Sequence, residues 1–594
     1  MSKLYSLFLI ILLLFPSVVP AIQTDDSKTF VITNVNVIPM DTEHILKNQT
    51  VVIQDGKITA LGSKVKMPKD TTVINGAGKY LIPGLFDMHM HIREGSERDL
   101  NMYLANGVTT IRSMHGSPWH LELRGKINSG EILGPRFFTT GPTTATERID
   151  TPEKAEKLVL EQKKAGYDAI KQYGSGTSEG MSRETYHRLM EAAKRENMRV
   201  IGHAPRNMPL SVALEEGQNS IDHAEEIYYT SEAILKFYKP HIDFQFGRTS
   251  LEDYRKANPE FPELKKMTPV FKKLARDAKQ ANLEFTATLT SFETIWRQTT
   301  SQFDAMLKEP ELKYVEPLTR ASWGPQTNRY RSNWMPRLTE MDKMLKQSLE
   351  LQKMMVKEFN DAGVPVMTGT DAPLTFVYPG FSLHHELELF VESGLSPYDA
   401  LRAATATPAR VLKIDDQVGT IAVGKTADLV LLDANPLDDI KNTQKISGVF
   451  TKGRWLSKTD IDRMLEKIAA DYEPLWKKIE IFQAFLDGGE IKKALEIYKN
   501  SGDKNEDVAG YVEGAINGIG YRYIRANDLD KAFEILKLNT EYFPNAFNTW
   551  DSLAEVYMLK GDKESAIKYY KKSLDMNPNN NNAVEQIKKL NQEK

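Results

Sequence analysis

Two histidines two positions apart, His89 and His91, are the first residues in the chain that could do chemistry together. In a β-strand, residues i and i+2 point to the same face, so both imidazoles would face one side. Two imidazoles on one face can hold a divalent metal ion between them. His-x-His alone is weak evidence, because it often arises by chance. Here it follows Pro83, Gly84 and Asp87 in the stretch LIPGLFDMHMHI, which favours a metal site over two surface histidines.

Four further residues that could bind a metal ion follow short apolar stretches later in the chain. They are Lys171 in YDAIKQY, His203 in RVIGHA, His223 in SIDHA and Asp371 in VMTGTDAP. Each residue alone has an explanation that needs no metal ion, since a lysine is usually solvated and a lone histidine is usually structural. Each also stands at the end of a predicted strand. That shared position predicts one common metal site.

The elements that position these residues alternate between strand and helix patterns over residues 83–412. Strands are expected at 85–91, 108–114, 136–141, 167–173, 199–204, 220–224, 284–290 and 364–370. Amphipathic helix patterns lie between them. Eight parallel strands with intervening helices predict a (β/α)8 TIM barrel, whose active site lies at the carboxyl ends of the strands. All the candidate ligands would then lie on the same rim.

Two connections of this barrel, at about 225–283 and 291–350, are too long for plain loops. Both leave the rim that carries the candidate ligands, so we expect lid insertions that set substrate specificity. The second insertion is rich in aromatic residues and arginines: Trp296, Phe303, Tyr314, Trp323, Tyr330, Trp334, Arg297, Arg320, Arg329 and Arg331. The alternative is that these aromatic residues form a small core of their own and touch no substrate.

The chain on either side of the barrel has β-type patterns. Residues 28–82 alternate in short apolar runs, with a hairpin signal at Asp55-Gly56, and a second β-type stretch covers 413–458. Neither stretch has enough strands for a stable core. We therefore expect both to meet in one small composite β-sandwich, with the barrel inserted between them.

Residues 459–594 are helical and repetitive. Three residue types recur at a spacing of thirty-four, namely Tyr523 and Tyr557, Ala532 and Ala566, and Pro544 and Pro578. This spacing matches the tetratricopeptide repeat. The sequence therefore predicts a C-terminal all-α repeat domain, which offers a docking surface for a protein partner.

Composition and the N-terminus indicate where the protein acts. In residues 1–21, Lys3 precedes an apolar run at 7–15 and small residues end at Ala21, as in a signal peptide. The alternative is a retained N-terminal anchor. We expect an exported protein, periplasmic or secreted, with no membrane span in the mature chain. The net charge of -3 over 594 residues gives no sign of a nucleic-acid partner, and the absence of cysteine excludes disulfides.

Taken together, these motifs resemble the amidohydrolase superfamily, in the branch of imidazolonepropionase-like enzymes and Xaa-Pro dipeptidases. The resemblance covers about 28–460 and rests on PGLFDMHMH, GVTTIR, IKQY, GHA, SIDHAEE, GTDAP, LHHELELF, AATATPAR and GTIAVGKTADLVLLDANP. It implies a site with two divalent ions, usually zinc. The implied ligands are His89, His91 and Asp371 for one ion, His203 and His223 for the other, and Lys171 bridging both as N6-carboxylysine.

The resemblance also implies roles in catalysis. An ammonium at Lys171 would be repelled by two dications, whereas a carbamate is an anion with two oxygens. If Lys171 stays a free amine, a single metal ion is expected instead. Asp371 would take a proton from the metal-activated water and deliver it to the leaving amine. Tyr173 would support the oxyanion, with packing at the barrel rim as its alternative. His115 is either structural or faces the substrate.

The sequence thus predicts an exported metal-dependent amidohydrolase that cleaves a C–N bond by a metal-activated hydroxide. The substrate expected is a small molecule with an amide bond, either a dipeptide or an N-acyl amino acid. The same scaffold could instead hydrolyse a lactone, a cyclic amide or a phosphotriester. A third alternative is an interaction protein that uses its repeats while the barrel is vestigial.

Overall fold

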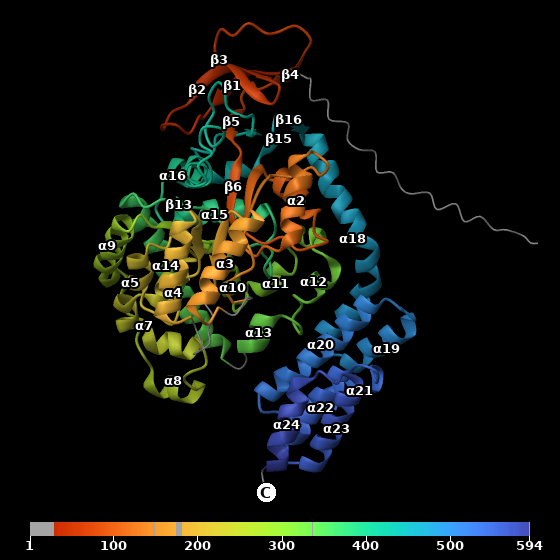
Figure 1. Cartoon of the computed structure of the whole chain (residues 1–594). Coiled ribbons are helices and arrows are strands. Elements are labelled where there is room, and N and C mark those ends of the chain that lie inside the picture. The colour runs from red at the N-terminus through yellow and green to blue at the C-terminus, as the bar shows by residue number, and fades with distance from the viewer. Residues whose placement is uncertain (1–28, 146–148, 174–180, 335–336, 593–594) are drawn as a thin grey trace, which may run out of the picture.

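The computed structural model describes residues 29–145, 149–173, 181–334 and 337–592 (Figure 1). The expected signal peptide at 1–21 lies outside these residues. Among the described residues, no helix combines the length and the apolar character needed to cross a bilayer.

Within the described residues, eight short parallel strands form the barrel: β6 (Leu85–Met90), β7 (Val108–Ser113), β8 (Arg136–Thr139), β9 (Ala169–Gln172), β10 (Arg199–Gly202), β11 (Ser220–Asp222), β12 (Glu284–Thr286) and β13 (Val366–Met367). Neighbours in this order pair in parallel in three ladders, β6-β7-β8, β9-β10 and β11-β12-β13. The barrel closes because the Met88 N–H donates to the Thr368 carbonyl across 3.0 Å. This is the (β/α)8 barrel that the sequence predicts.

Helices surround this barrel (Figure 1). They are α1 (Asp99–Ala105), α2 (Pro118–Asn128), α3 (Pro152–Ala165), α4 (Arg183–Arg195), α5 (Leu210–Glu216), α9 (Leu264–Gln280), α14 (Leu338–Asp361), α15 (Phe381–Glu392), α16 (Pro397–Ala403) and α17 (Ala406–Val411). Local sequence sets their ends. Helix α3 begins after Thr151, whose side chain accepts the Lys154 N–H, and it ends at Gly166 with a φ of 90°.

The two long connections fold into further helices on the barrel. The first holds α6 (Ala224–Thr230), α7 (Glu232–Gln245) and α8 (Leu251–Ala257) before α9, and the second holds α10 (Leu289–Arg297), α11 (Phe303–Met306), η1 (Pro310–Tyr314), α12 (Pro317–Ala321) and α13 (Arg329–Trp334) before α14. Some of their aromatic residues pack in a small core, and others line a pocket. Trp296 packs in a small core with Phe244 and Tyr254. Trp323 packs on Phe376 and Tyr378 and lines a pocket.

The β-type segments before and after the barrel join in one mixed sheet. Its strands are β1 (Thr29–Val37), β2 (Leu46–Gln54), β3 (Lys57–Gly62), β4 (Thr71–Asn75), β5 (Tyr80–Pro83), β14 (Leu429–Leu432), β15 (Ile446–Thr451) and β16 (Arg454–Ser457). The two segments meet where β14 pairs antiparallel with β5. The sheet is curled, so that β3 meets the segment just before β14. There the Ile58 N–H donates to the Lys425 carbonyl across 2.9 Å. It thereby encloses the apolar core of the predicted composite β-sandwich, which includes Ile32, Val51 and Phe450.

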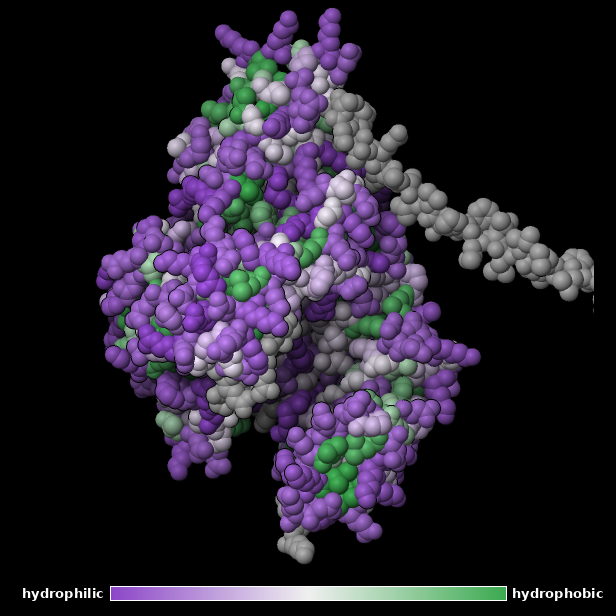
Figure 2. All heavy atoms as spheres, viewed as in Figure 1, coloured by the Kyte–Doolittle hydropathy of each residue, from purple (hydrophilic) through white to green (hydrophobic). Residues whose placement is uncertain are grey.

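Helix α18 (Lys458–Asp487) leads from this sheet along the barrel to the C-terminal helices (Figure 1). These are α19 (Ile491–Ser501), α20 (Glu506–Arg525), α21 (Leu529–Tyr542), α22 (Phe547–Leu559), α23 (Lys563–Met576) and α24 (Asn581–Gln592). The repeat positions Ala532 and Ala566 are fully buried between helices. At Gly520, a Cβ would lie only 2.5 Å from the Leu536 side chain, so close helix packing requires a glycine there. Figure 2 shows a hollow between the barrel and these helices.

Candidate metal centre

The carboxyl ends of β6 and β13 bring three of the expected ligands together. His91 Nε2 lies 2.9 Å from Asp371 Oδ1, and His89 Nε2 lies 3.6 Å from the same oxygen. One donor atom from each of these residues falls within 4.8 Å of the others, which is compact enough to hold one metal ion. The Asp371 N–H donates to the His89 carbonyl across 2.7 Å, which fixes the two strand ends to each other.

The other three expected ligands continue this cluster across the barrel mouth. Lys171 is 1% exposed, and its Nζ lies 3.2 Å from His89 Nε2. The His223 ring lies 4.3 Å from the His89 ring and 4.7 Å from the His203 ring, between centroids. Gly202 permits this approach, because a Cβ there would lie 2.6 Å from Lys171 Cδ. The structure therefore brings all six predicted residues together in one contiguous group.

Three histidines in the cluster have their Nδ1 atoms already bonded, so that Nε2 remains to face the centre. Their partners are Asp222 Oδ2 for His89 at 3.0 Å, Glu226 Oε1 for His203 at 2.7 Å, and Thr288 Oγ1 for His223 at 2.8 Å. In a metal-binding histidine, a hydrogen bond at the ring nitrogen that does not bind the metal fixes the orientation and the tautomer of the ring. Burial lowers the pKa of both His89 and His223 well below the usual value, which favours the neutral imidazole that binds metals.

The partner carboxylates are held in their charged form. Burial opposes ionisation of Glu226, but the neighbouring His203 and Arg206 lower its pKa to about 2. Burial also opposes ionisation of Asp222, yet Arg112 lowers its pKa. The Arg112 Nε donates to the Met88 carbonyl across 2.7 Å, which ties this charge network to β6.

The donor set fits divalent metal ions. It offers imidazole nitrogens and a carboxylate, which suit zinc and similar metals. Within the part of the chain that the structure describes, the one hydrogen-bond partner of Lys171 Nζ is His89 Nε2. Burial lowers the pKa of Lys171 to about 8, which raises the share of neutral amine that can react with carbon dioxide. A carbamate on this nitrogen would add the anion that a pair of cations needs.

Sequence reasoning missed the residues that hold the histidines. Asp222 and Glu226 lie in the same SIDHAEE motif as His223, so their position in the motif was an available signal. Thr288 gave none. It has a positive φ of 52° just before α10, and the carboxylate of Glu386 on α15 accepts the next two backbone N–H groups, from Leu289 at 3.1 Å and Thr290 at 2.7 Å. Glu386 thereby positions the residue that orients His223.

The remaining predicted residues lie around the rim. The Tyr173 side chain is 46% exposed, and its ring lies 4.7 Å from the His203 ring. His115 is exposed at the surface. Partial burial is the largest cause that lowers its pKa, and the neighbouring His91 and Lys171 add to this effect. His384 faces away from the centre, since its Nδ1 lies 3.0 Å from Thr443 Oγ1 beside the composite sheet.

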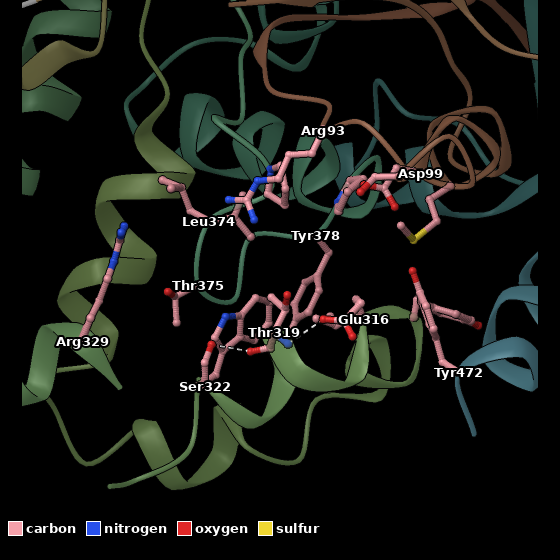
Figure 3. Close-up of a pocket in the computed structure, with 18 residues that line it drawn as sticks. Arg93, Asp99, Glu316, Thr319, Ser322, Arg329, Leu374, Thr375, Tyr378 and Tyr472 are labelled. Atoms are coloured by element: carbon pink, nitrogen blue, oxygen red, sulfur yellow. Dashed lines mark hydrogen bonds between the residues drawn. The ribbon is translucent and has the colours of Figure 1, made fainter. Parts of the chain in front are cut away.

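A pocket of about 260 Å3 is lined by residues that follow two of the candidate ligands in sequence (Figure 3). Its walls come from the loop after β6, the second insertion, the segment after Asp371, and helix α18. Arg329 and Thr375 stand on one side of the view, and Tyr472 stands on the other (Figure 3). The residues that adjoin the cluster in sequence are Arg93, two positions after His91, and Pro373, two positions after Asp371.

Comparisons with known proteins agree with this geometry. Residues 80–456 match the model of the Amidohydrolase family, and residues 547–580 match a tetratricopeptide repeat model. The chain is 24% identical over 488 residues to ochratoxinase of Aspergillus niger, covering 72% of this chain and 86% of that protein. It is 30% identical over 156 residues to imidazolonepropionase of Staphylococcus aureus, covering 26% and 34%. A solved Xaa-Pro dipeptidase with methionine in its active site has a TM-score of 0.52 at 20% identity, covering 72% and 100%.

Replacing Asp222 by Asn should weaken zinc binding about 10- to 100-fold, because the His89 ring loses the carboxylate that fixes it. The affinity can be measured by competition with a chromophoric chelator. Asp428→Asn is the matched control, since Asp428 is also a buried carboxylate but binds Arg136 near the composite sheet. Equal zinc affinity in Asp222→Asn and wild type would contradict the role given to Asp222.

Proposed function

The chain belongs to the amidohydrolase family, and on this premise we propose that it hydrolyses the amide bond of a dipeptide or an N-acyl amino acid with two bound zinc ions. The family and its hydrolase relatives make the chain an enzyme that acts on carbon–nitrogen bonds. The observation that carries the proposal is the convergence of the six donor residues at the barrel mouth.

The proposed ligands form two groups, one for each metal ion. His89, His91 and Asp371 would hold one ion, because their donor atoms already lie within 4.8 Å of one another. His203 and His223 would hold the second. Lys171 lies against His89 and would join both ions as a carbamate. The carbamate forms when the neutral Nζ attacks carbon dioxide, which creates an N–C bond and releases one proton.

When bound, such ions lower the pKa of a coordinated water and polarise a carbonyl. Burial opposes ionisation of Asp371, but the hydrogen bond from His91 lowers its pKa to about 2, so Asp371 is ionised. It would take the proton of the attacking water and pass it to the leaving nitrogen. The Tyr173 hydroxyl, on the exposed rim beside His203, would donate to the oxygen that gains negative charge.

The choice of an amide rests on the relatives. One solved relative is described as a Xaa-Pro dipeptidase, which favours a dipeptide for this chain. The relative named imidazolonepropionase keeps a cyclic amide as the second candidate. A vestigial barrel is disfavoured, because every residue of the proposed ligand set is present.

We further propose export of the chain and a protein partner for its repeats. Lys3 and the apolar run at 7–15 support export, and N-terminal sequencing of the mature protein should find a start near residue 22. A start at Met1 would contradict removal of a signal peptide and would favour the retained N-terminal anchor. Tetratricopeptide repeats present extended binding surfaces, so a chain without residues 529–592 should lose the partner and keep the hydrolase activity.

Removing the metal should abolish hydrolysis, and adding zinc should restore it. His223→Ala should lower kcat/KM at least 1,000-fold without lowering the melting temperature by more than a few degrees, since one ion loses a ligand (about 4 kcal/mol). The measurement is turnover of dipeptides, N-acyl amino acids, a cyclic amide and a lactone. His187→Ala is the control, because His187 lies on the exposed face of α4 and pairs with Glu216. Full activity in His223→Ala would exclude the assignment.

Protein prepared in 13C-labelled bicarbonate should show one carbamate carbon signal by NMR. Lys171→Arg should lose this signal, because a guanidinium does not react with carbon dioxide. Lys452→Arg is the matched control, since Lys452 is a half-buried lysine whose ammonium donates to the Ile127 carbonyl far from the cluster. Absence of the signal in active, zinc-loaded wild type would show that Lys171 stays an amine.

A further inference from the structure

Helix α18, which leads to the repeats, also supplies a wall of the pocket beside the metal centre. Tyr472 lies midway along α18 and lines the pocket together with residues of the barrel and of the second insertion. It enters from the side opposite Arg329 and Thr375 (Figure 3). The barrel loops and the insertion alone would therefore leave this side of the pocket open.

Two cation–π contacts hold the face of α18 that carries Tyr472. The Arg98 guanidinium lies over the Tyr472 ring, 4.8 Å from its centroid. One turn further along α18, the Arg320 guanidinium of α12 lies 3.7 Å from the centroid of the Trp476 ring. Residues four apart share a helix face, so one face of α18 is fixed both to the loop before α1 and to the insertion. Partial burial raises the pKa of Tyr472 to about 12.

The pocket adjoins the proposed reaction centre. Two residues of extended chain span at most about 7 Å. The backbones of Arg93 and Pro373 must therefore lie within that distance of His91 and Asp371, and both line the pocket. None of the six candidate ligands lines the pocket itself, so a substrate whose amide lies at the metal centre would have to span this short distance to place its next group here.

The aromatic part of the lining favours an aromatic group, while Arg93, Asp99, Glu316 and Arg329 give the same pocket charged walls. The rings of Tyr314, Trp323, Tyr378 and Tyr472 surround the space. The Tyr378 hydroxyl is already bound, since it donates to Glu309 Oε2 across 2.8 Å. Pockets that take a whole small molecule measure about 300–1,000 Å3, so a volume of 260 Å3 suits one side chain. Aromatic side chains attract one another in offset or edge-to-face contact, and these tyrosine and tryptophan side chains offer such contacts.

We propose that this pocket binds an aromatic side chain of the substrate, and that Tyr472 of α18 determines this specificity. The proposal rests on the proposed amide hydrolysis and adds the class of side chain that the site prefers. It gives the C-terminal part of the chain a direct role in substrate selection at the barrel.

The test compares the dipeptides Gly-Phe and Phe-Gly with Gly-Gly in the full-length, zinc-loaded chain. Tyr472→Ala should lower kcat/KM about tenfold for the better phenylalanine substrate and less than twofold for Gly-Gly. Tyr472→Phe should behave as wild type, because it keeps the ring. Tyr472→Leu keeps an apolar helix face for folding and should still lose the preference. Lys478→Ala, an exposed position on another face of α18, is the control. Equal losses on all three dipeptides, or no loss, would overturn the proposal.

A binding measurement separates this proposal from the proposed function. N-acetylphenylalanine and N-acetylglycine are titrated into chelated, metal-free protein by calorimetry, where no turnover occurs. Tighter binding of N-acetylphenylalanine that weakens about tenfold in Tyr472→Ala supports the pocket, even if wild type hydrolyses no amide. Equal affinity of wild type and Tyr472→Ala for N-acetylphenylalanine overturns the pocket, even if amide hydrolysis is found.

Discussion

The burial of a lysine amine among histidines is the interaction on which the rest of the site depends. Lys171 is almost completely buried, and its Nζ touches His89 Nε2. An ammonium in this position is disfavoured by desolvation, as the lowered pKa of Lys171 shows. The same burial keeps His89 and His223 neutral. The proposed carbamate on Lys171 would add an anion, and the two proposed cations would bind it together with the neutral imidazoles.

The fold maintains this arrangement with backbone conformations that ordinary residues rarely adopt. His223, Thr288 and Asp371 have φ angles of 72°, 52° and 58° at the ends of barrel strands. Such conformations cost about 1–3 kcal/mol each and persist where surrounding contacts determine them. Here the contacts are hydrogen bonds across the barrel, such as the one from the His223 N–H to the Thr286 carbonyl at 2.8 Å. These conformations occur at two candidate metal ligands, His223 and Asp371, and at the hydroxyl residue that orients His223.

The strands and the candidate ligands could be predicted because both follow local patterns. The apolar runs that end in Lys171, His203 and His223 set strand phase and rim position together. Thr288, the partner of His223, follows no such pattern, since Thr288 and the supporting Glu386 acquire their roles only when α10 packs against α15. The contribution of Tyr472 was also beyond prediction, because it depends on the path of α18 past residues almost 400 positions earlier in the chain. The aromatic residues of the second insertion proved to serve both as core and as pocket lining.

The central claim is that six side chains surround a pair of metal ions. X-ray diffraction from crystals of the zinc-loaded chain, recorded on both sides of the zinc absorption edge, tests it most directly. The account predicts two anomalous peaks about 3.5–4 Å apart, with electron density that continues from Lys171 Nζ to a group between them. A single peak beside His89 and His91, with Lys171 a bare amine turned away from it, would contradict the account.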